Sequence, residues 1–208
     1  PLPLLDPMTF VRLLSRLLPL CGVFPLLPPG AAAAPPSLLP APQHVRYDGG
    51  RLVLRDGLHI VVAASGPARV AEIAGVLRDE LRAQAGISAE IVSDETSAPV
   101  GSVHLLLTPP TGAVAPSPES YTLKIGRTIE IAAADPRGLL WGAQTLLQCI
   151  ATASGPPAVP HCEIADAPAS PWRALLLDPA RSFLDLDFLR RTIREMSAII
   201  FCAAGSMA

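Results

Sequence analysis

The stretch that decides the fold contains three runs: Glu119-Ser-Tyr-Thr-Leu-Lys-Ile125, Trp141-Gly-Ala-Gln-Thr-Leu-Leu-Gln148 and Pro171-Trp-Arg-Ala-Leu-Leu-Leu-Asp-Pro-Ala-Arg-Ser-Phe183. Around the first run, apolar and polar residues alternate on either side of Gly126-Arg127, which predicts a β-hairpin over residues 121–132. The second run belongs to a helix that is predicted to begin at Asp135-Pro136 and to bury one apolar face. The third run predicts a buried strand over Trp172–Asp178. This order indicates one domain followed by the beginning of a second.

Residues upstream of this stretch add strands and a helix. Asp56-Gly57 separates two short strand patterns and is a hairpin-type turn signal. A helix is predicted over residues 67–85, because apolar residues recur at helical spacing, and Gly86 is expected to end it. We therefore predict an α+β fold, in which a mixed or antiparallel sheet carries two helices on one face. The upstream strand patterns occupy residues 51–55, 58–62, 89–92 and 103–107, of which the last is apolar enough to be central.

A second structural unit is expected after a linker over residues 166–171. The buried strand of the third run is followed by a helix pattern over residues 187–197 and by a further strand pattern over residues 198–202. Strand, helix and strand at this spacing are typical of a parallel βα architecture. The residues expected to point inward from the helix are Leu189, Ile193 and Met196.

Composition narrows the class of protein. The 208 residues are 50% hydrophobic and 4% aromatic, with a formal net charge of −2. Lys124 is the only lysine and the arginines do not cluster, so we expect no binding to nucleic acid through a basic patch. The four histidines are scattered, and neither a Cys-x-x-Cys pair nor a glycine-rich phosphate loop occurs. No metal and no cofactor are therefore expected.

The N-terminus has the pattern of an export signal. A basic segment without acidic residues follows Met8, then comes the apolar stretch 17–27, and the alanines at 31–34 supply small residues for cleavage. Two prolines interrupt the apolar stretch, whereas a membrane span needs ~20 apolar residues. We expect residues 1–37 to be a signal peptide and a Pro/Ala-rich linker, and the mature protein to be exported without a membrane span. The alternatives are an uncleaved anchor and a lipid anchor at Cys21.

Three cysteines remain in the expected mature chain: Cys149, Cys162 and Cys202. Cys149 ends a predicted helix and Cys162 opens the next strand, so a disulfide between them is one interpretation in an oxidising compartment. The alternative is a pair of buried thiols. The sequence leaves both interpretations open.

The three runs, in this order, resemble glycoside hydrolase family 20, the β-N-acetylhexosaminidases. The similarity spans residues 38–198. It implies an α+β accessory domain over residues 38–168, followed over residues 169–208 by the first strand-helix unit of a truncated (β/α)₈ barrel. The residues that carry it are Glu119-Ser-Tyr121, Asp135, Gly138, Trp141-Gly142-Ala-Gln144-Thr145-Leu146-Leu147-Gln148, Ile164-Ala-Asp166-Ala-Pro168, Trp172-Arg173, Leu177-Asp178-Pro-Ala-Arg181-Ser-Phe183 and Ile193-Arg-Glu-Met196.

The resemblance implies a retaining, substrate-assisted hydrolysis of terminal N-acetylhexosamine, in which the acetamido oxygen of the sugar attacks the anomeric carbon. In the family, an Asp orients this group while a neighbouring Glu protonates the leaving oxygen. No residue here matches that pair, which we expect beyond Ala208, so we assign no catalytic residue. The implied partner is an oligosaccharide that contains N-acetylhexosamine.

Three residues match the family's barrel motif. The resemblance assigns Arg173 to the hydroxyls of the bound sugar, a task that suits the fixed fork of donors of a guanidinium group. The alternative for Arg173 is a structural ion pair. Asp178 and Arg181 are candidates for supporting the site, and a salt bridge between them is the interpretation that the residues favour.

Residues 199–208 depart from the family, which continues into a strand that bears Asn, His and Asp. We therefore interpret the chain as an N-terminal fragment of a β-N-acetylhexosaminidase that is inactive alone. One alternative is a non-catalytic α+β module that binds glycan or a partner. Another is the non-functional product of a truncated or frameshifted gene.

Overall fold

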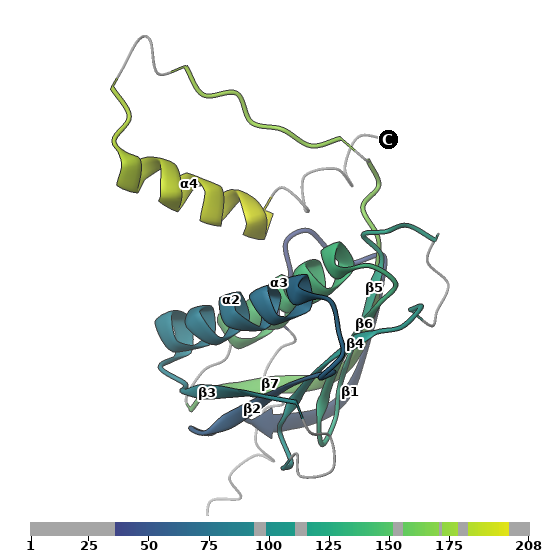
Figure 1. Cartoon of the computed structure of the whole chain (residues 1–208). Helices are drawn as coiled ribbons and strands as arrows, with labels where there is room; N and C mark the ends of the chain where they lie inside the picture. Colours follow the sequence, from purple (N-terminus) through teal and green to yellow (C-terminus); the bar gives the residue numbers. More distant parts are fainter. Residues whose placement is uncertain are drawn as a thin grey trace, which may run out of the picture. The chain divides into compact units, whose positions relative to one another are not determined.

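The computed structural model describes residues 36–93, 99–110, 116–151, 156–170, 172–178 and 183–199 (Figure 1). The predicted signal peptide, Arg181 and residues 200–208 lie outside these ranges, apart from Pro36 and Ser37. Within the described part, the elements are β1 (His44–Val53), β2 (Leu58–Val62), α2 (Ala68–Ala85), β3 (Ala89–Val92), β4 (Val103–Leu107), β5 (Tyr121–Ile125), β6 (Ile129–Ala133), α3 (Pro136–Ala151), β7 (Ala158–Asp166) and α4 (Leu186–Ile199).

The strands of the described residues form one mixed seven-stranded sheet in the order β1-β7-β5-β6-β4-β2-β3. β5 and β6 pair antiparallel with Leu123 opposite Ile131, which confirms the predicted hairpin around Gly126-Arg127. The pairs β2–β3, β2–β4 and β4–β6 are parallel. β4 lies inside the sheet, as its apolar sequence predicts.

The predicted hairpin at Asp56-Gly57 is wrong. β1 pairs with β7 at one edge of the sheet, whereas β2 pairs with β3 and β4. The Asp-Gly turn is hydrogen-bonded to Ser88, the residue that precedes β3 in the sequence. The Asp56 carboxylate accepts hydrogen bonds from Ser88 N at 2.9 Å and Ser88 Oγ at 3.1 Å. Gly57, at φ 75°, supplies the left-handed conformation that the turn needs. The turn signal is therefore real, but the strands that flank it pair elsewhere.

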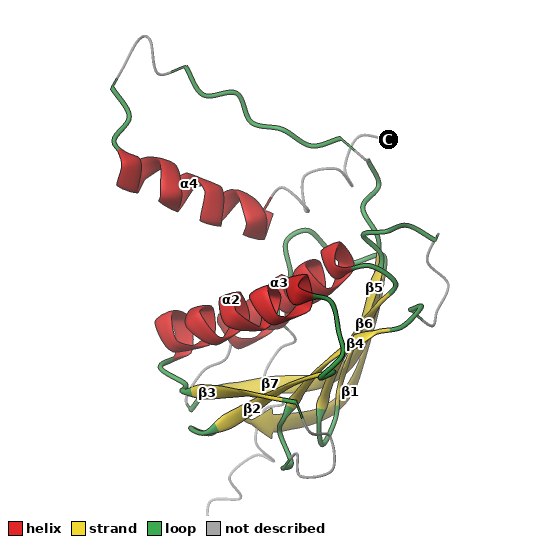
Figure 2. Cartoon of the chain, in the orientation of Figure 1, coloured by secondary structure: helices red, strands yellow, loops and turns green. Residues whose placement is uncertain are grey.

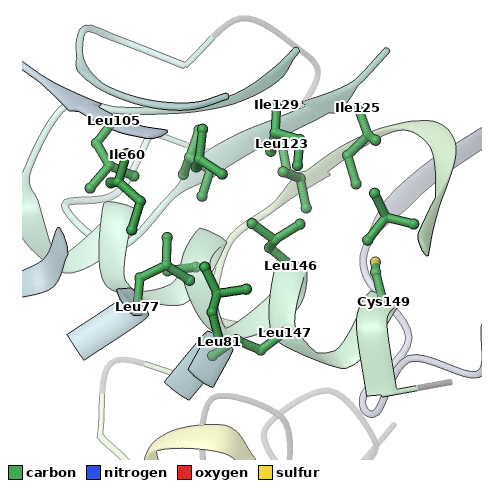
Figure 3. Close-up of a cluster of buried hydrophobic side chains, with 14 of the residues drawn as sticks. Ile60, Leu77, Leu81, Leu105, Leu123, Ile125, Ile129, Leu146, Leu147 and Cys149 are labelled. Carbon is green, nitrogen blue, oxygen red and sulfur yellow. The ribbon is translucent and has the colours of Figure 1, made fainter. Parts of the chain in front are cut away.

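The helices α2 and α3 cover one face of the sheet, as predicted (Figures 1 and 2). Gly86 ends α2 in the left-handed conformation, at φ 69°. Leu77 and Leu81 of α2 pack with Leu146 and Leu147 of α3 in one buried cluster beneath the strands (Figure 3). This cluster is the core of the described chain.

The predicted strand over Trp172–Asp178 is wrong: these residues pair with no described strand. A strand is stabilised by hydrogen bonds to a neighbour, and the described residues supply none here. The helix that follows is confirmed as α4, although Ile193 is 67% exposed rather than inward, and Leu189 and Met196 are only half-buried. Since α4 extends to Ile199, the strand expected from Ala198 is also wrong at its first two residues.

Candidate functional site

Arg173 lies in a partly buried polar cluster with Glu119 and Trp141. Glu119 precedes β5 and Trp141 lies in the second turn of α3, so the sheet and its covering helix position both side chains. Arg173 Nη2 donates to Glu119 Oε1 at 2.7 Å, and Nη1 donates to the carbonyl oxygen of Ser170. Trp141 Nε1 donates to the same Glu119 oxygen at 3.2 Å. The guanidinium carbon of Arg173 lies 5.8 Å from the centroid of the Trp141 ring, within the range of a cation–π interaction.

The ion pair is largely shielded from water. The side chains of Arg173 and Glu119 are 10% and 18% exposed. Withdrawing two charges from water is costly unless their remaining hydrogen-bonding atoms find partners. Ser170 and Trp141 provide such partners here. The cluster therefore attaches the segment that contains Arg173 to the sheet domain.

The structure shows Arg173 in the structural ion pair that the sequence leaves open as an alternative. Contact between Arg173 and a sugar stays a prediction. Asp178 is exposed, and its predicted salt bridge to Arg181 stays a prediction because Arg181 lies outside the described residues. Sequence reasoning missed the pairing of Glu119 with Arg173. Two features of the sequence could have indicated this pairing. Glu119 is a carboxylate just before a buried strand, and Trp141 needs a hydrogen-bond acceptor.

A second polar group, Asp166, is buried at the end of β7. Asp166 Oδ1 accepts a hydrogen bond from Gln43 N at 3.2 Å, and the Tyr121 hydroxyl also hydrogen-bonds to the carboxylate. Burial raises the pKa of Asp166 above its ordinary value, because desolvation outweighs these hydrogen bonds. The Tyr121 hydroxyl also lies 2.6 Å from Thr145 Oγ1, which links β7, β5 and α3 through one polar network.

The described residues line two hollows, the first beside Asp166 and the second elsewhere on the sheet domain. The cavity between Trp141 and Asp166 encloses about 10 Å³, room for about one water molecule and too little for a sugar ring. A groove of about 540 Å³ lies along the connection from β1 to β2, where Arg51, Arg55 and His59 contribute to its wall. Arginine and histidine side chains can donate hydrogen bonds to the hydroxyl groups of a sugar.

Among the described residues, no three His, Cys, Asp or Glu side chains gather in a way that suits a metal ion. In the same part of the chain, no helix combines the length and apolar character that crossing a membrane requires.

Comparison with known proteins shows the family. The family model described as "Glycosyl hydrolase family 20, domain 2" matches residues 35–167, more than half of the chain. The chain belongs to glycoside hydrolase family 20. The matched residues include the sheet, α2 and α3.

Two curated proteins that are similar to this chain are named β-hexosaminidases. The chain is 31% identical to a β-hexosaminidase of Vibrio furnissii over 175 residues, which cover 81% of this chain and 26% of the relative. It is 28% identical to a β-hexosaminidase of Porphyromonas gingivalis, with 77% and 21% covered. The chain therefore spans about a quarter of the length of these curated relatives.

Solved structures give the same result for the fold. A family 20 β-N-acetylhexosaminidase of Streptomyces coelicolor superposes with a TM-score of 0.61 at 30% identity, over 76% of this chain and 32% of that one. The N-acetyl-β-hexosaminidase of Streptomyces plicatus, solved with Thio-NAglucal, gives a TM-score of 0.62 at 28% identity, over 81% and 33%. The mixed sheet with its helices is thus a family 20 α+β fold.

Proposed function

We propose that this chain provides the accessory domain and the beginning of the catalytic domain of an exported β-N-acetylhexosaminidase. The observation that carries the proposal is the match of residues 35–167 to domain 2 of family 20, on a sheet and helix pair that superpose on family structures. The proposed boundaries are residues 1–37 for the signal and linker, 38–168 for the accessory domain and 169–208 for the start of the barrel.

The proposed reaction removes terminal N-acetylhexosamine from glycoconjugates or chitin oligomers with retention, assisted by the sugar's own acetamido group. The Asp-Glu pair that would orient this group and protonate the leaving oxygen is proposed to follow Ala208. Within this chain, Arg173, Asp178 and Arg181 are the proposed contributors to the sugar site. The ion pair of Arg173 with Glu119 supports a second task for Arg173, that of holding its segment against the accessory domain.

The activity is tested with a chromogenic N-acetyl-β-glucosaminide. We expect no turnover by the 208-residue chain, and turnover by a longer version that includes a family 20 barrel encoded downstream of residue 208. Turnover by the 208-residue chain itself would refute the placement of the catalytic pair. Sequencing the DNA past codon 208 in all three frames tests the alternative of a broken gene.

In the longer enzyme, the variants Arg173→Lys and Arg181→Lys distinguish sugar binding from a purely structural task. If the arginine binds sugar hydroxyls, its replacement by lysine should raise KM, because a forked donor becomes a point charge. The melting temperature should then stay close to that of the parent. A residue that only holds its segment should lower the melting temperature and leave KM unchanged. A raised KM in neither variant would remove both arginines from the sugar site.

The second candidate function is a non-catalytic glycan-binding module. The groove of about 540 Å³ beside Arg51 and Arg55 favours it. Calorimetry of the 208-residue chain with N-acetylglucosamine oligomers should then give heat that Arg55→Ala reduces. The absence of heat at millimolar sugar would exclude this candidate.

A further inference from the structure

The core contains two cysteines that the proposed function does not use. Cys149 lies near the end of α3 and Cys162 near the middle of β7, and the two residues are 1% and 2% exposed. Neither forms a disulfide in this structure, and the two side chains are hydrogen-bonded to each other. Figure 3 shows the sulfur of Cys149 directed from α3 toward the sheet. The two sulfurs therefore meet where the helix layer packs on the sheet.

The surroundings favour chemistry between these two sulfurs. In the sheet, Cys162 lies opposite Tyr47 of β1 and Ile125 of β5. Burial raises the pKa of the Tyr47 phenol, and the neighbouring cysteines add to this effect, so Tyr47 is neutral at physiological pH. A structural zinc ion needs four ligands, and the described residues place no third ligand beside the pair.

We propose that Cys149 and Cys162 are an oxidative modification site, at which a disulfide bond forms and fastens the end of α3 to β7. The bond requires an oxidant, which is a small-molecule disulfide such as glutathione disulfide or an equivalent exchange catalyst of an oxidising compartment. Residues 150–161 separate the two cysteines, so the ring that the bond closes is short.

The reaction balances as two thiol–disulfide exchanges. The thiolate of one cysteine attacks one sulfur of the oxidant, which forms a mixed disulfide and releases the first reduced thiol. The other cysteine, after losing its proton, then attacks the sulfur of the first and releases the second reduced thiol. The two protein thiols are oxidised, and one disulfide of the oxidant is reduced to two thiols.

The hydrogen bond between the sulfurs gives the two thiols different acidities in the packed core. It lowers the pKa of Cys162, against the opposing effect of burial, because it stabilises the Cys162 thiolate. The same hydrogen bond and burial raise the pKa of Cys149. This difference applies to the packed pair; once the pair opens to the oxidant, either sulfur can attack first. Since both residues are buried, we expect the exchange to take place during folding or local opening.

The test uses the 208-residue chain with Cys21→Ser and Cys202→Ser, so that only this pair can react. The protein is refolded in glutathione buffers of rising oxidised fraction and compared with the same protein in a phosphine reductant. We expect the intact mass to fall by two hydrogens, a peptide map to join Cys149 to Cys162, and the melting temperature to rise by roughly 10 °C over the reduced form.

Two matched variants, Cys149→Ala and Cys162→Ala, control for other effects of the buffers. Neither should lose two hydrogens, and oxidised buffer should not raise the melting temperature of either. The parent comparison, oxidised against reduced, remains decisive if a variant fails to fold. The proposal is overturned if both thiols stay reduced, if each carries only glutathione, or if the cross-linked form melts below the reduced one.

Discussion

Arg173 and Glu119 depend on each other because both are shielded from water. The side chains are 10% and 18% exposed, and Glu119 Oε1 accepts hydrogen bonds from both Arg173 Nη2 and Trp141 Nε1. Such a pair contributes little net stability over apolar replacements, but removal of one member leaves the other charge shielded and uncompensated. The surface pair Arg69–Glu72, with side chains 71% and 62% exposed, lacks this dependence.

Arg173→Ala is therefore expected to lower the free energy of unfolding by about 3 kcal/mol, measured by urea denaturation. Arg69→Ala is the matched control, and we expect it to cost at most about 0.5 kcal/mol. A double-mutant cycle with Glu119→Ala isolates the coupling between the two side chains. Equal losses in Arg173→Ala and Arg69→Ala would contradict the structural role of the shielded pair.

Asp166 provides a prediction about pH. Burial raises its folded pKa above the ordinary value of 3.8, so the folded state holds the proton more tightly than the unfolded state does. The stability that this carboxyl contributes is present below about pH 4 and is lost as the pH rises through the folded pKa. In urea denaturation between about pH 3 and 7, the stability of Asp166→Asn relative to the parent should rise with pH.

Asp56 is the control of opposite sign. Hydrogen bonds from the backbone and side chain of Ser88 lower the pKa of Asp56 below 3.8. Its contribution is therefore present above about pH 4 and is lost as the pH falls through the lowered folded pKa. Asp56→Asn should lose stability relative to the parent as the pH rises. The same pH trend in both variants would refute the assignments.

At the scale of elements, glycines set how closely α3 approaches the sheet. A Cβ atom added at Gly142 would overlap Ile131 Cγ2 and contact the Tyr121 ring, and one added at Gly138 would overlap the carbonyl oxygen of Ser120. A larger residue at either position would push the helix away from β5 and β6. By contrast, a Cβ atom added at Gly75 in α2 meets nothing within 4 Å.

We expect Gly142→Ala to destabilise the protein by about 1–2 kcal/mol, because overpacking outweighs the gain of about 1 kcal/mol in helix propensity. Gly75→Ala makes the same chemical change in open space and should stabilise by about 0.5–1 kcal/mol. Thermal and urea unfolding measure both effects. Stabilisation by Gly142→Ala would show that α3 does not lie so close to the sheet.

At the scale of the whole molecule, apolar side chains are exposed along the segment that follows the sheet domain. Trp172 is 82% exposed, and Leu176 and Phe183 are each 92% exposed. Exposed apolar groups gathered on one segment are typical of a surface that another part of a protein covers. The proposed barrel would supply that cover.

The 208-residue chain is therefore expected to self-associate as its concentration rises, which sedimentation velocity measures. Replacing Leu176 and Phe183 together by Ser should shift the protein toward monomer, because less apolar surface remains to be buried between copies. Val100→Ser, at a position that is 62% exposed on the sheet domain, should leave the association unchanged. Association that responds equally to all these changes would contradict the assignment of the surface.

Local sequence patterns correctly predicted the elements whose formation depends on residues close together in the sequence. Residues only a few positions apart define the apolar spacing of α2 and α3 and the turn between β5 and β6. These features can therefore be recognised in the sequence. The partner of β1 is not: β1 pairs with β7, more than a hundred residues later, although an Asp-Gly turn follows it directly. Likewise, a motif pointed to Arg173, but its partner Glu119 lies 54 residues away.

The sequence by itself therefore determined the helices, the β5–β6 hairpin and the resemblance to family 20, because backbone preference and motif spacing are properties of contiguous residues. Only the tertiary structure decided that β1 joins β7, that Arg173 forms a shielded ion pair with Glu119, and that the thiols of Cys149 and Cys162 meet in the core. These contacts arise when distant segments are packed around one apolar core, and no local pattern specifies which side chains that packing brings together.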